Sequence, residues 1–177
     1  MSLRENLLHN MAVIWWSLKR PRHPDAFTVP AGGVKANHLV VILPPEFEDF
    51  DVARYAVESL ADRIRPYRLT VLVRENFKSW LTGLEGARFL TYDPHRKNLL
   101  GFPANASRIS ARKLGADVVI DLTPRFSQYT AGLAAATNAP LRVSLEKEHA
   151  AEFFNVVVKP RQGRSLHEKY HVLLTHL

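Results

Sequence analysis

The acidic turn after the first predicted strand is the part of the sequence best suited to chemistry. Residues 39–43 form a short apolar run rich in β-branched side chains, and Pro44 and Pro45 end it. The acids that follow are Glu46, Glu48, Asp49 and Asp51. Ligands of an open α/β sheet bind beyond the carboxyl ends of its strands, so these carboxylates are the best candidates for a functional site.

A structural role for the same acids is also open. From Phe50 onward, apolar residues recur at helical spacing, with charged residues on the other side. Asp49 or Asp51 would then cap this helix, and the neighbouring acids would favour the positive end of its dipole. The sequence by itself leaves both roles possible.

Basic residues and one more acid follow later strands. The candidate ligand-binding residues are Arg96, Lys97, Asp121, Arg125 and Arg142. Arg96 and Lys97 lie in a loop, 93–107, where they could meet phosphate or remain solvated. Asp121 ends a predicted strand and Arg125 follows it. An Asp at such a position meets a polar ligand or, more often, binds the backbone of its own turn.

Strands and helices alternate along the rest of the chain. Apolar and β-branched runs predict strands at 39–43, 68–73, 87–92, 117–122, 140–145 and 153–158. Helical spacing predicts helices from Phe50, at 76–84, at 107–114, from about 126 to 137, and at 166–177, the last capped by Ser165. This order predicts a three-layer, Rossmann-like α/β fold: a mostly parallel sheet of about six strands with helices on both faces.

The N-terminal segment differs from the rest. Residues 3–18 are apolar nearly all round but too interrupted to span a bilayer, and no signal-peptide cleavage site follows. Its candidate interface residues are Trp15, Trp16, Lys19, Arg20 and Arg22. Tryptophans beside cations are typical of a helix at a membrane surface, although packing against the protein or a partner is equally compatible. We expect 1–37 to be this helix plus a Pro/Gly connector, and 38–177 to be one domain.

Composition limits the possible functions. The 177-residue chain is 46% hydrophobic with a net charge of +7, which suits one globular domain with an anionic partner. It has no cysteine, and its eight histidines lack ligand spacing, so we expect neither a disulfide nor a metal site. No glycine-rich nucleotide motif follows the first strand, and no cofactor is expected. The cations are spread along the chain without a recognition motif, which makes nucleic acid an unlikely partner.

The order of these pieces resembles the amino-terminal half of glycosyltransferase family 9, which includes the lipopolysaccharide heptosyltransferases. The similar pieces are LVVIL with its acidic turn and ESLADRIRP, RLTVLVRENFKSWL, GADVVIDLTPRFSQYTAGLAAATNAPLRVSL, AEFFNVVV, and SLHEKYHVLLTHL. The resemblance runs from about Leu39 to the last residue. It implies one half of a two-domain GT-B fold, the half that holds the sugar acceptor.

The resemblance also implies a role for the acidic turn. In the family, an Asp after the first strand is the proposed general base, which takes a proton from the acceptor hydroxyl. Counting from the strand, Glu48 occupies the nearest position here, with Asp49 and Asp51 as alternatives. The family's small residues and glycine in this turn are replaced by PPEFEDFD, which makes close approach of a sugar less easy.

Two hypotheses follow from this comparison. In the first, the chain is an acceptor-binding domain that cannot transfer sugar alone, because the nucleotide-sugar domain of the family is missing and would act in trans. In the second, the chain is a noncatalytic docking or structural subunit of a larger protein assembly, at a membrane or away from one. For either hypothesis we expect a cytoplasmic protein, and a peripheral position at the inner face of the cytoplasmic membrane, through contacts with its anionic surface, stays open.

Overall fold

The structure is a computed structural model that describes residues 11, 36–64 and 68–175. Its strands are β1 His38–Ile42, β2 Arg68–Arg74, β3 Arg88–Tyr92, β4 Val118–Asp121, β5 Leu141–Leu145 and β6 Val156–Val158. Its helices are α2 Phe47–Ile64, the 3₁₀ helix η1 Glu75–Trp80, α3 Asn105–Arg112, α4 Gln128–Ala136, α5 Ala150–Phe153 and α6 Leu166–Thr175. The expected N-terminal helix and connector, including Trp15, Trp16, Lys19, Arg20 and Arg22, lie outside the described residues.

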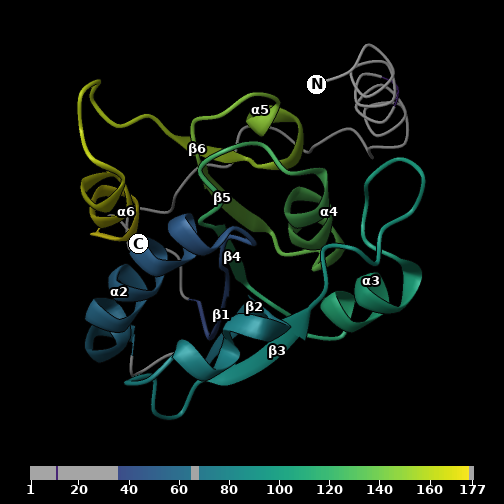
Figure 1. Ribbon diagram of the computed structural model, residues 1–177, viewed down its shortest axis with the longest axis horizontal. Coiled ribbons are helices and arrows are strands. Elements are labelled where there is room, and N and C mark those ends of the chain that lie inside the picture. The colour runs from purple at the N-terminus through teal and green to yellow at the C-terminus, as the bar shows by residue number, and fades with distance from the viewer. Residues whose placement is uncertain (1–10, 12–35, 65–67, 176–177) are drawn as a thin grey trace.

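The six strands form one sheet in the order β3-β2-β1-β4-β5-β6, and every pairing is parallel. β1 and β4 are buried along their whole length, as the continuous apolar runs predict. The chain moves outward from β1 to β3, then returns to the other side of β1 with β4 (Figure 1). The carboxyl ends of β1 and β4 are therefore the switch point, where open α/β sheets bind ligands.

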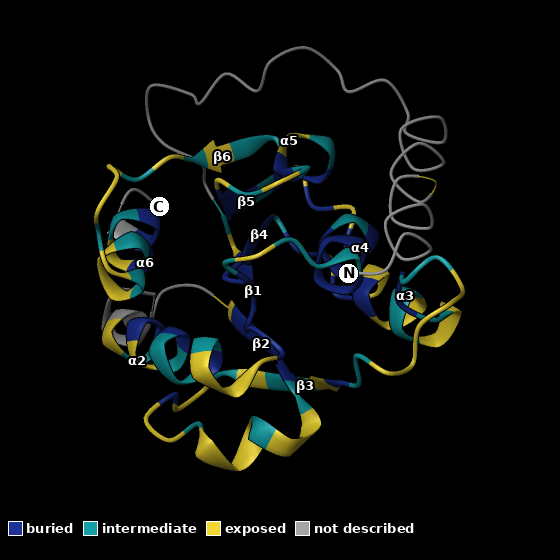
Figure 2. Ribbon diagram, turned by 45° about the horizontal axis from the view of Figure 1, so that its top comes forward, coloured by how far each residue is buried: buried dark blue, intermediate teal, exposed yellow. Residues whose placement is uncertain are grey.

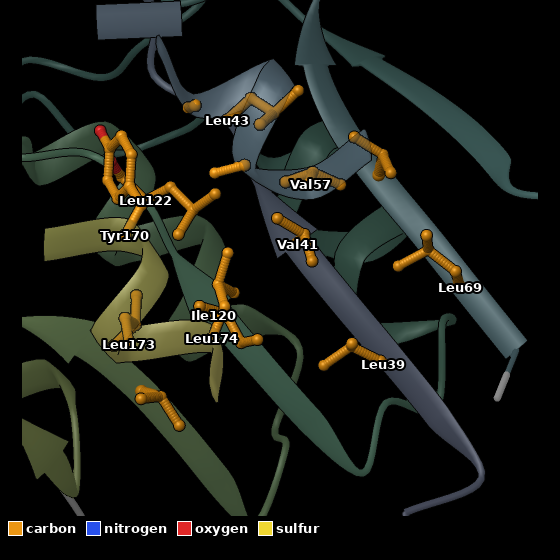
Figure 3. Packing of buried hydrophobic residues seen from close by; sticks show 14 of the residues in the cluster. Leu39, Val41, Leu43, Val57, Leu69, Ile120, Leu122, Tyr170, Leu173 and Leu174 are labelled. Carbon is orange, nitrogen blue, oxygen red and sulfur yellow. The ribbon is translucent and has the colours of Figure 1, made fainter. Parts of the chain in front are cut away.

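Helices cover both faces of the sheet, which confirms the predicted Rossmann-like α/β fold (Figure 1). Alternate residues of each strand point to opposite faces. Leu39, Val41 and Leu43 belong to the core under α2 and α6, where Tyr170, Leu173 and Leu174 of α6 meet the sheet (Figure 3). Val40 and Ile42 belong to the second core, under α3, α4 and α5.

Several element boundaries differ from the predicted ones. α2 begins at Phe47 rather than Phe50, because the backbone carbonyl of Glu46 already accepts a helical hydrogen bond from the Phe50 amide. The predicted helix 76–84 is the shorter η1, which buries none of its residues. Residues 153–158 divide between the end of α5 and the short edge strand β6, so the predicted start of the sixth strand is wrong.

The last helix begins with a reciprocal cap, as expected from Ser165. The Ser165 hydroxyl accepts a hydrogen bond from the Glu168 amide, and the Glu168 carboxylate accepts one from the Ser165 amide. This is a capping box, which satisfies two amides at the helix start. The Ser165 amide and hydroxyl both donate to the Glu168 carboxylate, and these two bonds lower the pKa of Glu168 below its ordinary value.

Candidate functional site

The turn after β1 is held by side chains at the ends of β2 and β3, which lie on one side of β1 in the sheet. The Tyr92 hydroxyl at the end of β3 donates to the Leu43 carbonyl at 2.6 Å, and Arg74 at the end of β2 donates to the Pro45 carbonyl at 3.1 Å. Burial, followed by the charge of Asp121, raises the pKa of Tyr92 well above its ordinary value, so this donor keeps its proton. The turn therefore presents α2 in a fixed position at the carboxyl edge of the sheet.

The turn after β4 is held by a buried polar network. One carboxylate oxygen of Asp121 accepts from the Thr123 amide at 3.0 Å and hydroxyl at 2.6 Å. The other accepts from Lys147 Nζ at 2.8 Å and from the Thr130 hydroxyl at 3.3 Å. The side chains of Asp121 and Lys147 are 0% and 2% exposed. Burying two charges is tolerated because they are paired with each other and with further hydrogen bonds.

Two more contacts fix the carbonyls of the same turn. Lys147 Nζ donates to the Thr123 carbonyl at 2.7 Å, and the Tyr170 hydroxyl of α6 donates to the Leu122 carbonyl at 2.5 Å. Burial raises the pKa of Tyr170 far above its ordinary value. The turn that leads to Arg125 thus has donors from the β5–α5 connection and from α6.

One ion pair joins the two turns. Arg125 donates from Nη2 to Asp49 Oδ2 at 3.0 Å, linking residues 76 positions apart in the sequence. The Arg125 side chain is 74% exposed and that of Asp49 is 15% exposed. The bond to Asp49 raises the pKa of Arg125, which keeps the guanidinium charged. A carboxylate and a cation therefore meet at the switch point, beyond the carboxyl ends of β1 and β4.

The other two candidate acids lie in different surroundings. Glu48 is exposed in the first turn of α2, beside Asp49. Asp51 lies one turn further and binds Arg54 Nε at 2.8 Å on the helix surface. Neither Asp49 nor Asp51 is the N-cap, because α2 starts before both, so the expected capping role is wrong. The first-turn acids Glu48 and Asp49 do lie where the helix dipole favours negative charge.

The remaining candidates are not gathered at the Asp49–Arg125 pair. Asp121 is fully buried in its own turn, the backbone-binding role that was the commoner expectation. Arg142 donates to the Phe153 carbonyl at 2.8 Å and to the Ala139 carbonyl at 3.0 Å, and so ties β5 to the chain around α5. Arg96 and Lys97 are exposed in the loop after β3, where Arg96 pairs with Asp93 at 3.7 Å.

Sequence reasoning missed Lys147, Tyr92 and Tyr170. Their hydrogen-bond partners are 24 to 49 residues away in sequence, so no local pattern reports them. A weak signal existed for Lys147, because it follows a strand that neighbours β4 at the same edge of the sheet. A buried carboxylate such as Asp121 also needs a nearby cation.

The described residues limit what else the site can hold. No group of three or more His, Asp or Glu residues in the described ranges is placed to bind a metal ion. Within the same ranges, no helix is both long enough and apolar enough to cross a membrane. The exposed groups at the switch point can accept hydrogen bonds from hydroxyl groups through Glu48 and Asp49, and can bind an anion through Arg125.

The described residues form a Rossmann-like α/β fold with an ion pair at its switch point. Among solved structures, a glycosyl transferase family 9 protein from Veillonella parvula is similar, with a TM-score of 0.57 and 16% sequence identity. The similarity covers 78% of this chain and 40% of that one, so the matched part spans less than half the length of this neighbour. No family model matches the sequence, and no curated protein matches it.

Proposed function

We propose that the chain is the acceptor-binding domain of a glycosyltransferase resembling family 9. The observation that supports this most is the pairing of Asp49 and Arg125 at the switch point of a fold shared with a family 9 protein. Asp49 or its neighbour Glu48 would accept the proton from the acceptor hydroxyl as that oxygen attacks the sugar. Arg125, with its exposed guanidinium, would bind an anionic group of the acceptor.

The contacts of the site show which candidates are available as the base and which are available to bind an anionic group. Asp51 is engaged with Arg54, and Asp121 is buried with Lys147, so neither is our first choice for the base. Arg96 and Lys97 remain candidates for a second anionic group, because both are exposed in the loop after β3. Arg142 drops out of the proposal, since its guanidinium binds backbone carbonyls.

The donor sugar would be bound by a separate domain. The match covers 40% of the similar family 9 protein, so most of that chain lies outside the part that this chain resembles. Transfer by this chain would therefore need a nucleotide-sugar-binding domain, supplied in trans or by another part of the protein. No nucleotide or metal cofactor is assigned to the described domain.

The test is an NMR titration of the full chain with a deacylated, phosphorylated lipopolysaccharide core oligosaccharide. We expect chemical-shift changes around Glu48, Asp49 and Arg125. Arg125→Gln should weaken binding about tenfold, because it removes a charge-assisted hydrogen bond. Arg88→Gln is the matched control, since Arg88 is exposed at the start of β3, on the opposite edge of the sheet.

A second experiment measures oligosaccharide binding and sugar transfer separately in two variants of the acidic residues. Asp49→Asn and Glu48→Gln keep the shape of the side chains but remove the basic carboxylate. If one of them is the base, its variant should bind the oligosaccharide with nearly normal affinity and fail in transfer once a donor-binding domain is supplied. Loss of transfer in neither variant, or binding that is insensitive to Arg125→Gln, would contradict the proposal.

A second candidate function is a noncatalytic docking subunit, and one observation favours it. Phe47, Tyr55 and Trp80 are 45%, 52% and 49% exposed on α2 and η1. The rings of Phe47 and Trp80 lie 5.3 Å apart, and η1 is largely exposed (Figure 2). Exposed aromatic residues in contact with one another are typical of protein interfaces.

A native pull-down of the full chain from its own cells compares the two candidates. A nucleotide-sugar-binding domain in the eluate would support the transferase. A large assembly without such a domain, lost from Trp80→Ser but not from Arg125→Gln, would support the docking subunit. If Arg125→Gln, rather than Trp80→Ser, loses the copurifying assembly, the switch point would be the surface that binds it.

A further inference from the structure

One flank of the molecule combines strong positive charge with exposed aliphatic side chains. We call it the basic flank and define it as the loop after β3 together with α3. Its cations are Arg96, Lys97, Arg108, Arg112 and Lys113, and the sequence has no acid from 94 to 116. Figures 1 and 2 place the loop and α3 on the same side of the molecule, away from α2 and α6.

The exposed aliphatic residues of the basic flank are Leu99 and Ile109. Leu99 at the tip of the loop is 95% exposed, and Ile109 on α3 is 55% exposed. Lone exposed apolar residues are ordinary on protein surfaces, but both of these stand among cations. Arg108, Ile109 and Arg112 of α3 and its C-cap residue Lys113 follow the i, i+1, i+4, i+5 spacing that places residues on one side of a helix.

The loop that carries Leu99 has a defined shape. The Asn98 side chain accepts hydrogen bonds from the amides of Leu100 and Phe102, each at 3.0 Å. The Asn98 amide donates back to the Phe102 carbonyl at 2.8 Å, which closes the tip. Lower down, the Ala104 amide donates to the Arg96 carbonyl at 3.0 Å. Leu99 is thus presented to solvent by a hydrogen-bonded turn.

The base of the loop is packed tightly on α4. Phe102 and Pro103 are buried, and a Cβ at Gly132 of α4 would lie 2.7 Å from a ring carbon of Pro103. The buried Ala111 of α3 belongs to the same core as Phe102. Loop and helix therefore rest on one support, and their exposed sides face away from it.

From these features we infer that the basic flank is a membrane-binding surface for anionic lipid headgroups. The cations are attracted to the negative surface of the bilayer, and each contributes about a fivefold gain in affinity. Leu99 and Ile109 enter the boundary between headgroups and acyl chains, as apolar residues of peripheral proteins do. Proteins bind single-stranded nucleic acid through cations and stacked aromatic rings, and a protruding leucine provides neither.

The inference does not depend on the proposed transferase role. The basic flank shares Arg96 and Lys97 with the proposed acceptor site, but the variants that test it change Leu99, Arg112 and Lys113 only, and lipid binding is measured without acceptor or donor. It also differs from the expected contact through Trp15 and Trp16, because variants of the basic flank leave those residues unchanged. Failure of lipid binding would leave the acceptor titration unaffected, so the two proposals are tested separately.

The experiment is flotation of the full chain with vesicles of phosphatidylcholine and phosphatidylglycerol in a two-to-one ratio. We expect binding that falls with added salt and is weak on pure phosphatidylcholine. The double variant Arg112→Glu, Lys113→Glu should bind at least about twenty-fivefold more weakly, from two cations at about fivefold each. Leu99→Ser should weaken binding about tenfold, because it removes one buried aliphatic side chain.

A matched control reverses two exposed cations elsewhere. Lys78 on η1 and Arg161 after β6 are both exposed, and the double variant Lys78→Glu, Arg161→Glu has the same net charge as the test variant. It should retain most of the binding. Equal losses in test and control variants, undiminished binding after the basic-flank changes, or tighter binding to an oligonucleotide than to vesicles would overturn the inference.

Discussion

Two ion pairs, each between a basic side chain and an aspartate, lie at the switch point. They differ in burial. Lys147 and Asp121 are joined at 2.8 Å with almost no exposure of either side chain. Arg125 and Asp49 are joined at 3.0 Å, with the arginine largely in solvent. The buried pair has further partners in Thr123 and Thr130, so its geometry is determined on several sides.

The comparison separates a structural ion pair from an exchangeable one. In low dielectric surroundings, removing one partner leaves a charge that water cannot reach, which is costly. A pair near solvent loses little when it opens, because water replaces each partner. The buried pair therefore sets the shape of the turn after β4, and the more exposed pair at the end of that turn can open at little cost.

The largest expected effect is from Lys147→Met. It leaves the Asp121 carboxylate buried without its cation and should lower the free energy of unfolding by about 3 to 5 kcal/mol. Urea denaturation followed by circular dichroism measures this loss. Lys159→Met is the control, because Lys159 pairs with Glu146 at 2.7 Å with both side chains exposed. Similar losses in the two variants would show that burial does not distinguish them.

The double variant Asp121→Asn, Lys147→Met sharpens the same comparison. Removing both charges removes the uncompensated one, so the double variant should be less destabilised than the sum of its single variants. We expect a coupling of about 1 to 3 kcal/mol, in the range for residues in one buried network. Denaturation of all four proteins gives the value, and strict additivity would contradict a direct interaction.

Tyr170→Phe tests the donor that α6 supplies to the same turn. The Leu122 carbonyl would lose its buried partner, which should cost about 1 to 3 kcal/mol at neutral pH. Since the raised pKa of Tyr170 favours the protonated native state, wild-type stability should be intact below about pH 10 and fall as pH rises above it. The variant should show a smaller alkaline loss, and an equal loss would contradict this origin.

The smallest expected effect is from Arg125→Gln. Opening an exposed pair should change the free energy of unfolding by less than about 1 kcal/mol, and added salt should reduce the difference further. The comparison with Lys147→Met is made in the same urea titration. A loss of several kcal/mol from Arg125→Gln would mean that the two pairs do not differ as their exposure indicates.

Much of this arrangement was predictable from the sequence. The β-branched runs located all six strands, and the alternation with helices predicted the parallel sheet. The rule that ligands meet the carboxyl ends of strands placed Asp49 and Arg125 at one edge, although 76 residues separate them. The apolar runs and helical spacings that mark strands and helices involve residues close in sequence, so a single sequence is enough to predict them. Their alternation then predicts the parallel topology.

The missed features depend on distant partners or on local backbone competition. Lys147 reads as a surface lysine between two glutamates, and only the folded chain brings it to Asp121. α5 is four residues long, too short for a periodic pattern. The start of α2 was set three residues late because Phe47 is exposed and gave no inward-facing signal. These errors arise where tertiary contacts, rather than sequence spacing, decide the structure.

The glycine on α4 has a consequence for how this fold can vary. A methyl group at Gly132 would collide with Pro103 and Phe102. The size of the side chain at position 132 therefore limits the path that the loop can take over α4. A sequence that replaces this glycine must also shorten the loop or change Pro103. Gly132 and Pro103 should therefore change together during evolution.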